Sequence, residues 1–107
     1  MHKNLIDKEI SKIFQALAHP IRLEILELFR KERVMCVCEI VGKLKKEQSV
    51  ISRHLNTLKL AGILDYEEKG VRSFYKVKND SVYKILGIAK DILFKELEAQ
   101  RKITEKI

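Results

Sequence analysis

The sequence has little of the two residues that most often interrupt regular structure, with one proline and four glycines in 107 residues. So few turn-forming residues argue against a disordered chain and against an all-β fold. There are only two cysteines, no apolar run reaches membrane-spanning length, and no signal peptide opens the chain. These absences make a cytoplasmic protein with reduced thiols, without a membrane partner, the default expectation.

Positive charge is what the sequence has in excess. It carries 22 lysines and arginines against 15 acidic residues, a formal net charge of +7. Such a balance suits a polyanionic partner, most simply nucleic acid, with an acidic membrane surface as the other option. With 46% hydrophobic and 35% charged residues, residues 1–107 are expected to form one soluble domain with one modest core.

Apolar residues at helical spacing predict four helices in the first part of the chain, over residues 4–18, 20–31, 36–45 and 47–62. His19 and Pro20 separate the first two, because the residue before a proline is pushed out of the α region. Pro20 then suits the first turn of the next helix, and we expect His19 to cap or pack at this join. The short link at residues 45–47 is typical of a helix-turn-helix.

The segment 47–62 has two different sides. One is apolar and is formed by Ile51, Leu55 and Leu58. The other is small, polar and hydrogen-bonding, and with the preceding glutamine it comprises Gln48, Ser49, Ser52, Arg53 and Asn56. A helix of this kind can lie in a DNA major groove, although the pattern alone also fits an ordinary amphipathic surface helix. We expect His54 near the backbone or in an internal hydrogen bond, and Gly62 in the left-handed conformation that ends many helices.

After Gly62 the apolar period changes to two, which predicts a β-hairpin over residues 63–77 with its turn at 69–72. Lys69 and Arg72 at the tip would lie near the minor groove or the phosphates; otherwise they belong to a solvated turn. The aromatic residues of the hairpin are expected to pack it rather than to stack on bases. A helix-turn-helix followed by such a hairpin is a winged helix, so the expected fold is mainly α with a small β-hairpin wing.

A last helix is predicted from Ser81 to about Thr104, with Asp80 as its cap. Its apolar stripe and that of residues 4–18 exceed what the rest of a small chain can cover. We therefore predict a homodimer through the first and last helices, which would place two recognition helices on successive turns of DNA.

Three segments resemble the ArsR/SmtB-type winged helix-turn-helix repressors: residues 16–26, residues 50–64 and residues 69–75. They stand in the order and spacing of that family, and the match covers nearly the whole chain. The resemblance implies a dimeric transcriptional repressor that sits on double-stranded operator DNA and leaves it when an inducer binds. No catalytic constellation rises above chance, so no enzyme is expected.

Cys36 and Cys38 resemble the thiol sensor segment of that family. The resemblance implies a site for a thiophilic inducer such as As(III), Sb(III) or a soft divalent ion like Cd(II) or Pb(II). Both sulfurs can reach one ion only where the backbone is not helical, because residues i and i+2 do not share a helix face. Ion capture would then distort the first turn of the 36–45 helix and move the helix-turn-helix.

Other interpretations of the two cysteines stay open. They could be small half-buried apolar residues, or they could sense redox state without any metal. A disulfide between residues two apart is expected to be strained, so that oxidation gives an intersubunit bond or a sulfenic acid.

The segment also departs from the arsenic-responsive pattern, which commonly has a third thiolate where this chain has Val41. His2, Glu39 or an external thiol are the candidates to complete the site. Residues 81–107 contain no histidine, so a zinc or nickel site on the last helix is not expected. A separate hypothesis is a winged-helix module that binds RNA or an acidic protein, which would show no DNA sequence preference.

Overall fold

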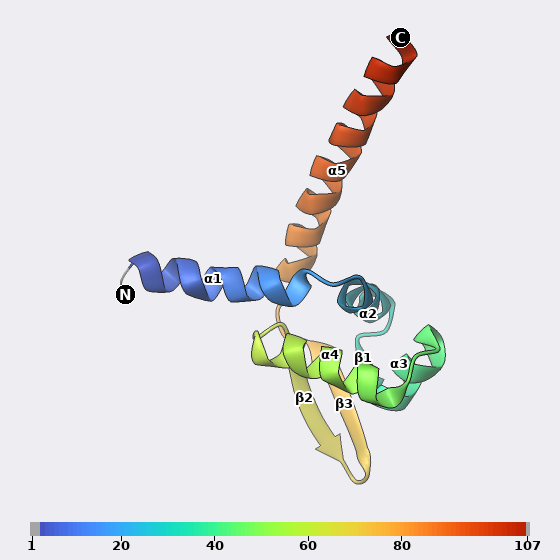
Figure 1. Ribbon diagram of the computed structural model, residues 1–107. Helices are drawn as coiled ribbons and strands as arrows, with labels where there is room; N and C mark the ends of the chain where they lie inside the picture. Colours follow the sequence, from blue (N-terminus) through green and yellow to red (C-terminus); the bar gives the residue numbers. More distant parts are fainter. Residues whose placement is uncertain (1–2, 107) are drawn as a thin grey trace.

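The computed structural model describes residues 3–106, and Figure 1 shows its helices and strands in chain order. The helices are α1 (Lys3–Leu17), α2 (Pro20–Lys31), α3 (Val37–Leu44), α4 (Gln48–Leu60) and α5 (Ser81–Lys106). The strands are β1 (Val34–Cys36), β2 (Leu64–Lys69) and β3 (Arg72–Val77). The five predicted helices and the hairpin are therefore confirmed, with ends shifted by a few residues at most.

The core lies where α2, α3 and α4 meet the sheet. Its fully buried side chains are Ile25, Leu26, Met35, Cys36, Ile40, Ile51, Leu55, Leu58 and Leu64. Three of them form the predicted apolar side of α4. Since burying such side chains stabilises the fold by roughly 1.5–3 kcal/mol each, this stripe fixes which side of α4 faces outward.

The join between α1 and α2 follows the expected local chemistry. His19 is extended, with φ −155° and ψ 130°, and its Nδ1 accepts a hydrogen bond of 3.1 Å from the backbone N–H of Ile21. Pro20 occupies the first turn, where its missing N–H costs nothing. The expected capping role of His19 is confirmed.

The sheet has one strand more than the hairpin. Its order is β1-β3-β2 and all pairs are antiparallel, with Cys36 opposite Phe74 and Met35 opposite Tyr75. Residues 34–36 are too few to show an alternating pattern, so β1 is absent from the sequence prediction. This strand ties the start of α3 to the hairpin. Gly62 and Gly70 have positive φ values of 80° and 62°, as the end of α4 and the hairpin turn require.

The start of α5 corrects one expectation. Asn79, not Asp80, provides the cap, because its Oδ1 accepts a hydrogen bond of 2.9 Å from the N–H of Ser81. The carboxylate of Asp80 instead pairs with Arg33 at 3.2 Å. An asparagine two residues upstream makes the same kind of local bond to the backbone.

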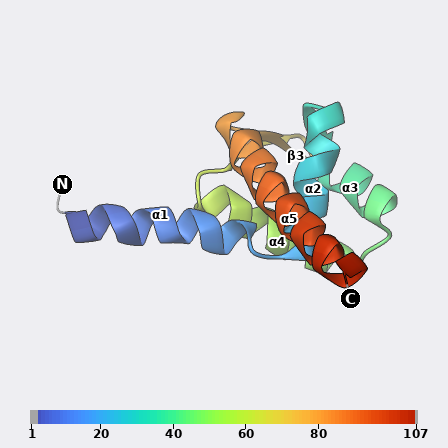
Figure 2. The ribbon, with the colours of Figure 1, turned by 90° about the horizontal axis from the view of Figure 1, so that it is seen from above.

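Two helices extend away from the core. Both views show α1 leaving the body sideways, and Figure 1 shows α5 rising on the side opposite the hairpin (Figures 1 and 2). Large apolar side chains stand exposed on both, at Leu5, Ile6, Ile10 and Phe14 of α1 and at Ile88, Ile92, Leu93, Phe94, Leu97 and Ile103 of α5. Within residues 3–106, none of the helices has the length and apolar character needed to span a bilayer.

Candidate nucleic-acid interface and thiol pocket

The polar side of α4 faces outward. Gln48, Ser49, Arg53 and Asn56 are exposed and Ser52 is half-buried. Within residues 3–106, none of these five side chains forms a hydrogen bond to another residue. Their donors and acceptors are therefore open to a partner, which is the arrangement that base contacts in a major groove require.

The tip of the hairpin carries two exposed cations. Lys69 and Arg72 are partners across the last rung before the turn. Behind them the aromatic residues pack the hairpin as expected: the rings of Tyr66 and Tyr75 lie 5.1 Å apart between centroids. Lys59 of α4 sits over the Tyr66 ring at 4.8 Å. This cation–π contact joins the wing to α4.

His54 lies on the inner side of α4, away from the exposed polar residues. Its ring is 7% exposed and stands 4.3 Å from the ring of His19. The expected internal hydrogen bond is not found: its Nδ1 and the Nε of Arg22 have no partner in the described part of the chain. Burial, and then the nearby charges of His19, Arg22 and Arg53, lower the pKa of His54.

This lowered pKa predicts a loss of stability in mild acid. In the unfolded chain His54 becomes protonated near its ordinary pKa of about 6.5. In the folded chain its pKa is lower, so the ring stays neutral until a lower pH. In that window the unfolded state binds more protons, so the free energy of unfolding falls as the pH falls. Urea unfolding at pH 7.5 and pH 5.5 should show a smaller decrease for His54→Gln than for the parent. An equal decrease in both would contradict it.

The two cysteines stand at the junction of β1 and α3. Cys36 is extended, with φ −81° and ψ 159°, and is the N-cap of α3, while Cys38 lies in its first turn. The condition of a non-helical backbone is thus met. Their Cα atoms are 5.3 Å apart and their sulfurs are joined in a disulfide. This differs from the expected reduced thiols and from the expectation that a disulfide between residues two apart is disfavoured, because the extended N-cap brings the sulfurs together.

The start of α3 is capped by the side chains of Cys36 and Glu39, a role that the sequence did not predict for either. Cys36 Sγ accepts a hydrogen bond of 3.4 Å from the N–H of Glu39, and Glu39 Oε1 accepts one of 3.2 Å from the N–H of Cys36. The pair forms a capping box in which cysteine replaces the usual serine or threonine. Glu39 is therefore held as a capping residue, rather than being a free solvated carboxylate.

A pocket of about 340 Å³ joins the two candidate sites. Its lining includes Cys36 and Cys38, and from α4 and the hairpin it includes Gln48, Ser52, Lys59, Tyr66, Val71, Arg72, Ser73 and Tyr75. The sequence did not predict a role for Lys59, nor that the two cysteines lie close to the wing. The missing signal was β1, since its pairing with β3 sets Cys36 opposite Phe74.

The donor set restricts what the cysteines could hold. In the described range, 3–106, His, Cys, Asp and Glu side chains do not form any group of three suited to a metal ion. Once the disulfide is reduced, the described residues of one chain therefore offer two sulfurs, which are soft ligands and fit thiophilic ions rather than hard ones. The possible third ligand His2 lies outside the described residues.

Comparisons with known proteins agree with this geometry. Residues 19–66 match the family model "Bacterial regulatory protein, arsR family". The chain is 40% identical over 85 residues to the HTH-type transcriptional regulator MJ1325 of Methanocaldococcus jannaschii, covering 79% of this chain and 96% of that protein. It is 31% identical to the arsenical resistance operon repressor of Bacillus subtilis, covering 79% of this chain and 81% of the repressor.

A solved structure has the same fold. The homodimeric winged helix-turn-helix DNA-binding domain Mb0332 of Mycobacterium bovis superposes with a TM-score of 0.78 at 23% identity, covering 91% of this chain and 89% of that one. The winged helix inferred from the sequence is thereby confirmed. With the family model and the relatives at 31% and 40% identity, it follows that this chain belongs to the arsR family of bacterial regulatory proteins and is a winged-helix transcriptional regulator, not an enzyme.

Proposed function

We propose that the chain acts as a homodimeric repressor that reads operator DNA through α4 and the wing. It leaves the DNA when a thiophilic inducer, As(III) or a soft metal ion, binds Cys36 and Cys38. The observation that carries this proposal is the shared pocket, in which the two cysteines lie with Gln48 and Ser52 of α4 and Arg72 of the wing.

Each exposed group has a defined part in DNA recognition. Arg53 has the fork of donors that pairs with guanine, and the Asn56 amide matches adenine. Gln48, Ser49 and Ser52 offer further hydrogen-bonding groups near the start of the helix. Lys69 and Arg72 at the wing tip supply phosphate contacts, which fix position and add affinity without reading sequence.

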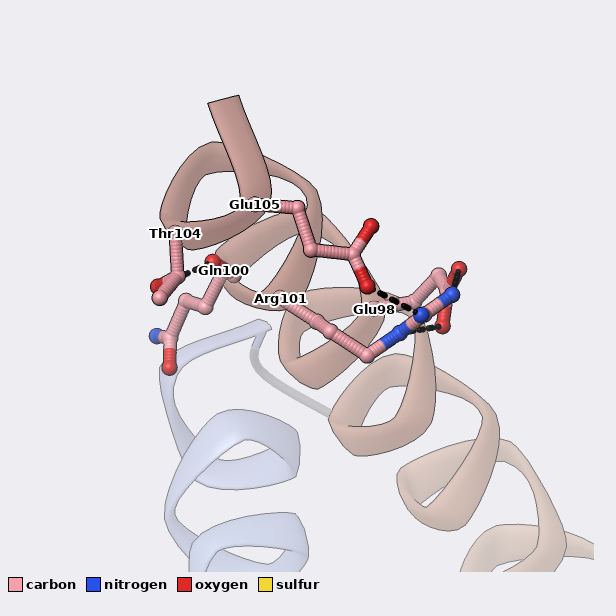
Figure 3. A network of polar contacts seen from close by, with 5 residues as sticks. All are labelled: Glu98, Gln100, Arg101, Thr104 and Glu105. Atoms are coloured by element: carbon pink, nitrogen blue, oxygen red, sulfur yellow. Dashed lines mark hydrogen bonds and ion pairs between the residues drawn. The ribbon is translucent and has the colours of Figure 1, made fainter. Parts of the chain in front are cut away.

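The uncovered apolar side of α5 supports a second copy as its partner. Val82 is buried in the core, and the same helical stripe continues to Leu93 and Leu97, which are each about half exposed. Figure 3 shows the end of α5, where Arg101 pairs with Glu98 and Glu105. The middle of α5 therefore carries an apolar stripe that the described residues leave uncovered, while its last turns carry ion pairs. The Mycobacterium bovis domain with the same fold is a homodimer.

Inducer binding would act through the cap of α3. In the reduced form Cys36 and Cys38 offer two thiolates, and a small external thiol can complete a trigonal site for As(III). Coordination withdraws Cys36 Sγ from the N–H of Glu39, and loss of such a cap costs about 0.5–2 kcal/mol. The similarity to the arsenical resistance operon repressor of Bacillus subtilis supports this inducer class.

The test begins with the reduced protein and DNA sites selected from a random pool. Affinity for the selected site should exceed that for bulk DNA and should fall steeply with salt, because phosphate contacts release counterions. Arsenite added to the complex should then displace the protein. A selection that yields no sequence preference would refute operator recognition, and a complex indifferent to arsenite and Cd(II) would refute the inducer class.

Replacing Arg53 by alanine is expected to remove discrimination at one base position. The loss should be about 1–3 kcal/mol for the preferred base and near zero for the other three, because a bidentate contact disappears. Lys69→Ala should instead weaken all sequences alike and reduce the salt slope by about one. Binding to four operator variants by fluorescence anisotropy separates the two results; equal losses on all four with Arg53→Ala would contradict its reading role.

The disulfide favours a second candidate for the signal. With the sulfurs joined, Cys36 and Cys38 cannot bind an ion, so oxidation itself would set the state of α3. Operator affinity of the oxidised and reduced proteins, measured at the same salt, tests this alternative. A clear difference supports redox sensing, whereas equal affinities leave ion binding as the only signal at this pocket.

A further inference from the structure

The two sulfurs of the disulfide differ in access. Cys36 is 2% exposed and packed in the core, while Cys38 is exposed in the first turn of α3. Both line the pocket between α4 and the wing. A small thiolate that enters this pocket should therefore meet the exposed Cys38 more readily than the buried Cys36.

The hydrogen bonds favour the same direction of attack. When a thiolate bonds to Cys38 Sγ, the disulfide breaks and its electron pair goes to Cys36 Sγ. That sulfur accepts the N–H of Glu39 at the start of α3, where a negative charge is stabilised. Attack on Cys36 would instead leave the charge on Cys38, for which the structure gives no such donor.

The lining selects the charge of the incoming molecule. Lys59 and Arg72 are the charged residues in it, and both are cations. Two carboxylates near its lining residues are already hydrogen-bonded: Glu39 accepts the N–H of Cys36, and Glu68 accepts the hydroxyl of Tyr66. At about 340 Å³ the pocket is in the range that holds small ligands.

We propose that Cys38 is a site of reversible S-thiolation by a small carboxylate-bearing thiol, with Cys36 as the resolving thiolate. The thiolate RS⁻ attacks Cys38 Sγ, giving Cys38–S–SR and the Cys36 thiolate. In the reverse step Cys36 attacks Cys38 Sγ and expels RS⁻, so no further oxidant or reductant is needed. The adduct would occupy the pocket that Gln48 and Arg72 line. Its effect on operator binding rests on the proposed function, but the chemistry does not.

The first test asks which sulfur carries the adduct. The oxidised full chain is mixed briefly with reduced glutathione, the released thiol is trapped with iodoacetamide, and both positions are assigned by tandem mass spectrometry. We expect glutathione on Cys38 and the alkyl group on Cys36, with a preference of about tenfold or more. Glutathione on Cys36, equal labelling of both, or no intramolecular disulfide after oxidation would overturn the proposal.

The second test asks whether the pocket selects charge. Cys36→Ser leaves Cys38 as the only thiol, and its rate of mixed-disulfide formation is measured with anionic glutathione disulfide and with cationic cystamine. Adding Lys59→Gln or Arg72→Gln should slow the anionic reagent about threefold to tenfold and not the cationic one. Lys76→Gln, with the same charge change outside this lining, is the matched control. Equal slowing in the control would overturn the pocket's role.

The two tests read covalent chemistry without DNA, so their failure and the failure of operator binding are distinguishable. If thiolation occurs as expected, the glutathione adduct of Cys36→Ser should lose operator affinity relative to the unmodified variant. An adduct that forms on Cys38 and leaves affinity unchanged would overturn the regulatory consequence, while a protein without sequence preference would overturn the proposed function.

Discussion

Replacing Leu93 by glutamate is expected to convert the proposed homodimer to a monomer and to weaken operator binding by about 100-fold or more. The loss is large because two linked recognition helices bind the second half-site at high effective concentration, an advantage of roughly 10²–10⁴. A monomer keeps its contacts to one half-site and loses that advantage altogether.

The choice of Leu93 follows from the course of α5. The stripe that starts in the core at Val82 reaches Leu93 about three turns later, where the side chain is 51% exposed. In a two-fold dimer the same surface of each copy meets the other, so one substitution introduces two carboxylates into one apolar interface. Buried charges without partners are strongly unfavourable, whereas the isolated subunit tolerates glutamate on an exposed helix.

Sedimentation and anisotropy together check this expectation. Leu93→Glu should sediment as a monomer with an unchanged helical circular dichroism signal, which separates lost association from lost folding. Lys102→Gln makes the same change in net charge on the opposite side of α5 and should remain a dimer with nearly parental affinity. A dimeric Leu93→Glu protein with parental affinity would mean that the subunits meet elsewhere.

Helix α4 could be predicted from the sequence because one local pattern determines both that it forms and which of its sides faces the core. Ile51, Leu55 and Leu58 are all fully buried, so Ser49, Arg53 and Asn56 must face outward. The same logic applies to the His19-Pro20 join, where proline geometry and a side-chain cap act within three residues. Such features depend on residues close together in the chain, so the sequence is enough to predict them.

The thiol pocket could not be predicted in the same way. It depends on β1, a three-residue strand that is held by its pairing with β3, about 40 residues further along the chain. That strand makes Cys36 an extended N-cap, which in turn allows the disulfide with Cys38 that was expected to be strained for residues only two apart. The cap of α5 was mispredicted for the same reason. Asp80 pairs with Arg33, which is far away in the sequence.

Replacing either cysteine by serine is expected to abolish release of the reduced protein from DNA by arsenite. One remaining thiolate loses the chelate advantage of the pair, so affinity for the ion should fall by about 100-fold or more. The two variants differ in what else they change. Serine at position 36 keeps an oxygen acceptor for the N–H of Glu39 and is a favoured N-cap, so α3 should remain intact and DNA binding should persist.

This retained cap makes the cysteine variants informative about mechanism as well as about binding. Cys36→Ala removes both the sulfur and the cap, and it should cost about 0.5–2 kcal/mol of stability that Cys36→Ser does not. If uncapping α3 is the route from ion to DNA, Cys36→Ala should also bind operator more weakly than Cys36→Ser before any ion is added. Equal operator affinities of the two variants would mean that loss of the α3 cap does not weaken DNA binding. Undiminished release of both serine variants by arsenite would mean that the inducer binds somewhere other than Cys36 and Cys38.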